Sequence, residues 1–262
     1  MRDVYRLVLL AHIVSGFIGL IAFWTPALAR KGGRVHVTAG RVFFWATSGI
    51  ALSGLAITGL LLGDPIGIKV MHPESLSPER TAEIVSSIRI SSLFLVYLLS
   101  ITFTPVYHGV RVLATRRNPA SLRTPIHTTL NVATLLASAA MVAVGLSVGP
   151  LLFLYMSPIG FLIGWGNLQF ARKPYPTPMA WWYEHMGSML GGGIAFHTAF
   201  LVLGAGRLFG IQLDGPVAAI PWLLPTLIGV PASAVWTNYY KKRFNEGAQK
   251  TSESDEPLRR TA

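Results

Sequence analysis

The sequence contains no cysteine and few charged residues. Of its 262 residues, 13% are Asp, Glu, Lys or Arg, whereas 52% are hydrophobic. A soluble domain carries about 25% charged residues, so there are too few charges here to cover a surface that faces water. The lack of cysteine excludes disulfides, thiolate metal sites and a cysteine nucleophile. Lipid is therefore the expected solvent for much of the exterior.

The sequence contains seven long stretches without Asp, Glu, Lys or Arg, as expected of a membrane protein. Each is about 20 residues long, which is enough for an α-helix to cross the hydrocarbon of a bilayer. These stretches cover residues 7–28, 42–62, 90–110, 129–148, 150–170, 186–206 and 216–236. The strands of a membrane barrel would be half this length and would alternate polar with apolar residues. The sequence predicts an all-α, polytopic transmembrane helical bundle of about seven spans, as one domain over residues 1–244, followed by a disordered tail over 245–262.

Basic residues show how this bundle is oriented. The net charge is +11, and most of the 22 Lys and Arg residues lie in segments that fall on one side of the membrane. These segments contain Arg30, Lys31, Arg34 and Arg41; Arg111, Arg116, Arg117 and Arg123; Arg172 and Lys173; and the basic residues after position 240. The positive-inside rule then places the N-terminus outside and the C-terminus in the cytoplasm. The charge is mainly a topology signal, so the expected partners are the lipid bilayer and anionic headgroups at the inner face, near Arg116–Arg117 and Lys241–Arg243, and not nucleic acid.

Histidines are the informative ionisable residues, because the spans contain no Asp, Glu or Lys away from their ends. An ionisable group inside a bilayer is costly to bury and marks a candidate functional site. His12 and His197 are predicted to lie at similar depth in the outer half of the membrane. A second layer is predicted near the inner ends of the spans and consists of His36, His108, His127 and His185.

Three interpretations of these histidines remain open, and one of them is a proton or substrate pathway through the bundle. The other two concern binding and packing. In the first, all six bind a cofactor, haem b or a transition metal, with His12 and His197 as a metal-binding pair, because imidazole suits iron, copper and zinc. Glycines one helical turn from the outer pair, Gly16 and Gly193, would leave space for a flat cofactor. In the second, the rings hydrogen-bond to neighbouring Ser, Thr or carbonyl groups, and the glycines allow close helix packing.

The leading functional hypothesis is therefore a histidine-ligated haem or metal redox or metal-handling protein. A secondary transporter or channel for a small solute is the alternative, and prolines in the seventh span together with polar residues at helical spacing in the third and fourth favour it. Those polar residues are Tyr97, Ser100, Thr104, His108 and Arg111, and then His127, Asn131, Thr134 and Ser138. A non-catalytic membrane subunit or scaffold with a small-molecule or protein partner is the third hypothesis. No P-loop or common hydrolase motif is present.

Two further features concern acidic and loop residues. Glu184 lies just before the sixth apolar stretch, and it is interpreted either as a carboxylate that orients His185 or, preferably, as a surface charge. Between the second and third spans, a polar segment over 63–83 is long enough to form a small lid or interfacial helix. Within it, Ser77 followed by Pro78 is typical of a helix start.

Three short motifs give the sequence a resemblance to a known family. They are His12-x-x-x-Gly16, the run from Lys31 to His36 that leads to Gly40-Arg41-Val42-Phe43, and His185-Met186 followed by the segment from Ala195 to Phe200. On these motifs the chain resembles a bacterial family of multi-pass membrane proteins with no assigned function. The resemblance implies a membrane fold of seven or eight helices in the cytoplasmic (inner) membrane. It implies no particular activity, cofactor or catalytic residue.

Overall fold

The computed structural model describes residues 1–116, 118–147, 150–210, 217 and 220–246 of the chain. This part of the chain forms helices and no strands. Seven of the helices are long and apolar enough to cross a membrane. The predicted all-α polytopic bundle is therefore confirmed.

Most of the membrane-spanning helices are longer than the apolar stretches that predict them. They are α1 (Arg2–Leu28), α2 (Arg34–Gly63), α4 (Pro78–Ala114), α5 (Pro125–Ser147), α6 (Leu151–Arg172), α7 (Ala180–Ala199) and α9 (Ile220–Arg243). Shorter elements are α3 (Pro65–Lys69), η1 (Pro73–Ser75), η2 (Pro119–Leu122), a π-helix (Phe200–Ala205) that continues α7, and α8 (Gly206–Phe209). Although α9 contains Pro225 and Pro231, it is one continuous helix.

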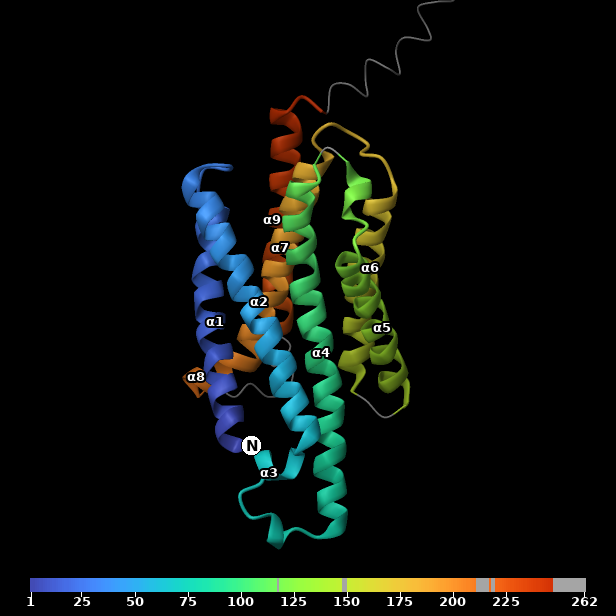
Figure 1. Ribbon diagram of the computed structural model, residues 1–262. Coiled ribbons are helices and arrows are strands. Elements are labelled where there is room, and N and C mark those ends of the chain that lie inside the picture. Colours follow the sequence, from blue (N-terminus) through green and yellow to red (C-terminus); the bar gives the residue numbers. More distant parts are fainter. Residues whose placement is uncertain (117, 148–149, 211–216, 218–219, 247–262) are drawn as a thin grey trace, which may run out of the picture.

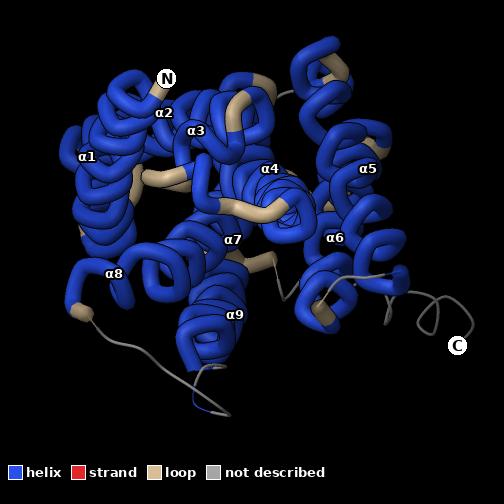
Figure 2. The backbone as a smooth tube through the Cα atoms, turned by 90° about the horizontal axis from the view of Figure 1, so that it is seen from below, coloured by secondary structure: helices blue, strands red, loops and turns tan. Residues whose placement is uncertain are grey.

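Helix α4 lies at the centre of the bundle (Figures 1 and 2). On one side α2 packs against it and carries α1 on its outer face, on another side the pair α5 and α6 packs against it, and α7 also packs directly against it. Helix α9 is peripheral and contacts mainly α7. The α1–α2 loop, η2, the α6–α7 loop and the last turn of α9 lie at one end of the bundle, which we call the basic end (Figure 1). These are the segments in which the sequence concentrates its basic residues.

The surface of the bundle is apolar and parts of its interior are polar. Large side chains such as Leu162 and Trp45 are 75% and 71% exposed, while Asn131 and His108 are fully buried. Exposing these side chains to water would cost free energy. Exposing them to lipid tails does not, because the tails are as apolar as the side chains they contact. The chain is therefore an integral, multi-pass membrane protein. The predicted orientation across the membrane stays a prediction.

Two glycines let α6 approach its neighbours closely. A Cβ on Gly164 would lie 2.8 Å from the carbonyl oxygen of Asn131, and a Cβ on Gly160 would lie 2.9 Å from the ring of Tyr97. These residues are four apart and so lie on one face of α6. This is the spacing at which small residues bring membrane helices into backbone contact.

Local signals determine where several helices begin. Ser77 caps α4, since its hydroxyl accepts a hydrogen bond from the Arg80 amide at 3.2 Å, and Pro78 is the first helical residue. The helix start predicted at this point is confirmed. It does not begin a separate lid, because the helix runs without a break into the third span.

The end of α9 folds back onto α7. Asn245 adopts a left-handed conformation with φ of 57°, a common way to end a helix, and this turns the chain toward the α6–α7 loop. The carboxylate of Glu246 then accepts hydrogen bonds from the Met179 amide and the Thr177 hydroxyl at 2.9 and 3.1 Å. A negative charge is thus placed at the N-terminus of α7, where the helix dipole favours it. The remainder of the predicted tail, 247–262, lies outside the described residues.

Candidate functional site: a buried Glu–His–His chain

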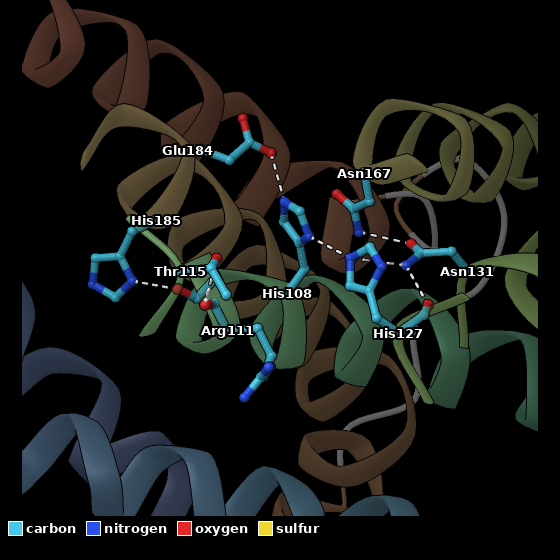
Figure 3. A network of polar contacts seen from close by, with 9 residues as sticks. His108, Arg111, Thr115, His127, Asn131, Asn167, Glu184 and His185 are labelled. Carbon is cyan, nitrogen blue, oxygen red and sulfur yellow. Dashed lines mark hydrogen bonds and ion pairs between the residues drawn. The ribbon is translucent and has the colours of Figure 1, made fainter. Parts of the chain in front are cut away.

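Three helices bring ionisable side chains together near the basic end. His108 comes from the last third of α4, His127 from the first turn of α5, and Glu184 from the first turns of α7 (Figure 3). The position of His127 follows from how α5 begins. The Thr124 hydroxyl accepts a hydrogen bond from the His127 amide at 3.3 Å, and Pro125 opens the helix.

The three side chains form a continuous hydrogen-bonded chain. His108 Nε2 lies 2.9 Å from a carboxylate oxygen of Glu184, and His108 Nδ1 lies 2.8 Å from His127 Nε2. The His108 side chain is 0% exposed, whereas that of Glu184 is 29% exposed. The chain therefore links a residue that reaches the surface with two imidazoles inside the bundle.

The carboxylate determines where the protons lie when both rings are neutral. A carboxylate only accepts hydrogen bonds, so His108 donates its Nε2–H to Glu184. His108 Nδ1 then carries the lone pair and accepts a hydrogen bond from the Nε2–H of His127. The remaining nitrogen, His127 Nδ1, is left with a lone pair.

Two asparagines fix the His127 ring and its helix. Asn131 donates from its amide nitrogen to the His127 carbonyl oxygen at 2.7 Å, and its side-chain oxygen accepts a hydrogen bond from Asn167 at 2.9 Å. Asn131 and Asn167 are both buried, and the close approach of α6 at Gly164 brings them together. The Asn131 amide nitrogen also lies 3.3 Å from His127 Nε2, so the His127 ring lies between α4 and the α5–α6 pair.

The free end of the chain is His127 Nδ1. This nitrogen is buried and has no hydrogen-bond partner among the described residues, and His127 as a whole is 1% exposed. A buried polar atom without a partner costs free energy of about 1–3 kcal/mol and calls for an explanation such as a water molecule, a ligand or a proton pathway.

A column of small polar side chains continues from His127 toward the opposite end of the bundle. The Thr104 and Thr134 hydroxyls lie 3.0 Å apart across α4 and α5, and Ser138 follows one turn later. His127 and Ser138 are separated by about 16 Å along the helix at 1.5 Å per residue. Thr104 and His108 on the third span therefore face Thr134 and His127 on the fourth span inside the bundle.

The structure does not bring His12 and His197 together. His12 Nδ1 lies 3.0 Å from the Ser53 hydroxyl, whereas His197 accepts a hydrogen bond from the Trp24 indole at 3.1 Å and donates one to the Gly193 carbonyl at 2.8 Å. Trp24 lies about 18 Å beyond His12 along α1, so the two histidines lie at different depths. Both ring nitrogens of His197 are already engaged within the protein.

The predicted inner layer divides into two groups. His108 and His127 contact each other, while His36 and His185 lie apart from them and donate to carbonyl oxygens. His36 bonds to Pro26 at 3.0 Å and His185 to Gly109 at 2.8 Å. Beside His36, Lys31 donates to two carbonyls in the last turn of α1, and burial lowers the pKa of this lysine.

These arrangements limit how a metal could bind. Iron or zinc takes histidine nitrogens at about 2.0–2.1 Å, so two ligands on opposite sides of one ion lie about 4 Å apart. At 2.8 Å, the facing nitrogens of His108 and His127 bond directly to each other. Among the described residues, no group of three or more His, Cys, Asp or Glu side chains is arranged to bind a metal ion.

Two members of the site were not identified from the sequence. The preferred interpretation of Glu184 was a surface charge and the alternative was a partner for His185, yet its partner is His108. Its position does contain a signal, because Glu184 is the only Asp or Glu between Glu83 and Asp214. Asn167 offered no comparable signal, because a single asparagine in an apolar helix does not reveal which helix it faces.

Comparison with known proteins gives no relative from which to assign this site. No family model, no curated protein and no solved structure matches the chain. The resemblance to a bacterial membrane protein family stays a prediction.

Proposed function

We propose that this chain is a membrane transport protein that moves protons, with Glu184, His108 and His127 as the relay at its cytoplasmic end. One observation supports the proposal above all others: the hydrogen-bonded chain ends inside the bundle on a ring nitrogen that has no described partner. Chains of His, Glu and Asp inside membrane bundles are typical of proton pathways in pumps and transporters.

The relay works by passing protons along existing hydrogen bonds. A proton binds to the lone pair of His127 Nδ1, and the proton on His127 Nε2 moves across 2.8 Å to His108 Nδ1. The proton on His108 Nε2 then moves across 2.9 Å to the Glu184 carboxylate. Glu184 releases it to the aqueous face, so one proton enters and one leaves. Each ring ends with its proton on the opposite nitrogen and must rotate before the next transfer.

The direction of the pathway follows from the basic end. By the positive-inside rule, this end faces the cytoplasm of a bacterial cell, and Glu184 is the member of the relay that reaches it. The polar column over Thr104, Thr134 and Ser138 leads from His127 toward the outside. Water molecules between these hydroxyls would complete the path across the membrane.

Proton flux into proteoliposomes tests this proposal. Vesicles that contain the full-length chain and a trapped pH indicator are given a pH gradient, with valinomycin and potassium to balance charge. We expect the internal pH to relax at a rate that rises with the amount of protein per vesicle. Relaxation no faster than in protein-free vesicles, with and without small solutes supplied for co-transport, would rule the proposal out.

Binding of haem or a transition metal is the second candidate, and the free Nδ1 of His127 also supports it. A metal-ligating histidine needs its other nitrogen bonded to a polar partner, as His127 Nε2 is. The other ligands would have to come from a cofactor or a partner protein. Protein purified from cells supplied with haem would then show a Soret band, or a metal in stoichiometric amount. A colourless, metal-free preparation that transports protons would leave the relay as the function.

A further inference from the structure

Tyr97 extends the polar column of the bundle toward the end opposite the basic end. It precedes Thr104 by seven residues, so it lies two turns further along the same face of α4. A Cβ on Gly160 would overlap the Ser138 hydroxyl and lie 2.9 Å from the Tyr97 ring. The Ser138 hydroxyl and the Tyr97 ring therefore meet over this glycine of α6.

The Tyr97 hydroxyl is bound to the backbone of α6. It donates to the Met156 carbonyl oxygen at 2.5 Å and accepts a hydrogen bond from the Gly160 amide at 3.2 Å. These two backbone groups belong to residues four apart, which is the pair that an α-helix joins by a direct hydrogen bond. The hydroxyl thus bridges two groups that can also bond to each other.

A proline weakens the same turn of α6. Pro158 has no N–H, so the Leu154 carbonyl lacks its usual helical partner and accepts a hydrogen bond from the Ser157 hydroxyl at 3.0 Å. Side chains replace missing backbone bonds in this way in many membrane helices. The turn from Leu154 to Gly160 is therefore held partly by side chains, at a position where helices commonly bend.

Apolar rings lie beyond Tyr97 on its outer side. Phe94 stacks on Phe153 with ring centroids 5.0 Å apart, and the ring of Trp222 lies 5.7 Å from that of Phe94. Tyr97 itself is fully buried beneath them. Because Phe153 belongs to α6, a change in the turn that follows it would move this apolar cover. Apolar constrictions of this kind close pathways by excluding water.

We propose that Tyr97 is the outer gate of the proton pathway, an inference that rests on the proposed function. In the closed arrangement, which the structure shows, the hydroxyl bridges Met156 and Gly160 and its proton points away from the column. In the open arrangement, Met156 and Gly160 bond directly to each other. The hydroxyl then donates to Ser138 and accepts a hydrogen bond from a water molecule on the outer side. Each of these polar groups has a partner in both arrangements, as a two-state element requires.

The first test observes the Met156 carbonyl by NMR, in the full-length chain in nanodiscs. Met156–Ser157 is the only Met–Ser pair in the sequence, so ¹³C at methionine carbonyls and ¹⁵N at serine select this one peptide group. We expect two exchanging states in the wild type and one state in Tyr97→Phe, because only the direct backbone bond remains there. A single state in the wild type, or unchanged exchange in Tyr97→Phe, overturns the gate.

The second test measures proton flux in proteoliposomes. Tyr97→Phe is expected to lower the flux about tenfold or more, because the column loses the hydroxyl that connects it to the outer side. Tyr155→Phe is the matched control, since Tyr155 is 75% exposed on the same turn of α6 and has no hydrogen bond among the described residues. Its flux is expected to stay within about twofold of the wild type.

Together the two tests separate the gate from the relay. Flux that is lost in His108→Phe but kept in Tyr97→Phe leaves the relay in place and overturns the gate. A wild type without protein-dependent flux overturns proton transport itself, while the Met156 signals still show whether the Tyr97 hydroxyl changes partners. Ser138→Ala removes the other hydroxyl and is expected to lower the flux as Tyr97→Phe does, so it decides the question if Tyr97→Phe does not fold.

Discussion

Replacing His108 with phenylalanine is expected to reduce proton flux by about a hundredfold, because proton transfer through a positioned acid or base typically contributes a factor of at least that size. Among the described residues, His108 is the only link between Glu184 and His127, and it bonds to both at 2.9 and 2.8 Å. Phenylalanine fills a similar volume but carries no nitrogen, so neither proton transfer remains possible. The measurement is the rate of pH relaxation in proteoliposomes.

His12→Phe is the matched control for this experiment. It replaces another histidine in a membrane-spanning helix, but His12 bonds to Ser53 and has no contact with the relay. We expect its flux to stay within about threefold of the wild type, since one buried hydrogen bond contributes only about 1 kcal/mol and lies away from the pathway. Equal flux in the wild type and His108→Phe, with both proteins folded, would mean that protons do not pass through this chain.

Replacing Gly164 with leucine is expected to destabilise the protein by about 3 kcal/mol. The new Cβ would lie 2.8 Å from the carbonyl oxygen of Asn131 and from the side chain of Leu135. A backbone carbonyl cannot rotate away, so α5 and α6 must separate. That movement would also displace Asn131 and with it the His127 ring. Thermal unfolding of the detergent-purified protein measures the loss of stability.

Gly166→Leu is the control on the same helix. Nothing lies within 4 Å of a Cβ at this position, and the residue is exposed on the lipid-facing side of α6. Leucine has a higher helix propensity than glycine, by somewhat less than 1 kcal/mol, so stability should stay the same or rise. If both variants were equally stable, the close packing of α6 against α5 would not contribute to the fold.

The seven spans could be predicted from the sequence because each span must meet the requirements of the bilayer by itself. Stretches without charge must be about 20 residues long and helical to cross hydrocarbon, so length and composition identify the spans without knowledge of any contact. Capping is equally local: Ser77 before Pro78 predicts the start of α4, and the structure confirms it. Helix ends were less accurate, because α4 and α5 extend beyond their apolar cores into polar turns.

The partners of the histidines were not predictable from depth alone. Depth follows from position along one helix, whereas contact also depends on which helices are neighbours and how each is rotated. His108 and His127 were placed in one layer with His36 and His185, but they face the α5–α6 pair and Glu184, while the other two face α1 and α4. The contact between His197 and Trp24 depends on α7 packing beside the half of α1 that is nearer to the basic end. No local sequence pattern indicates that these two helices are neighbours.

The relay depends on a direct hydrogen bond between the buried imidazoles of His108 and His127. Solid-state NMR of the protein with ¹⁵N-labelled histidine tests it, since nitrogens joined by an N–H···N bond give a cross-peak between two rings. Among the 7 histidines we predict one such pair, absent from both His108→Phe and His127→Phe. Spectra in which every imidazole is independent of the others would contradict the relay.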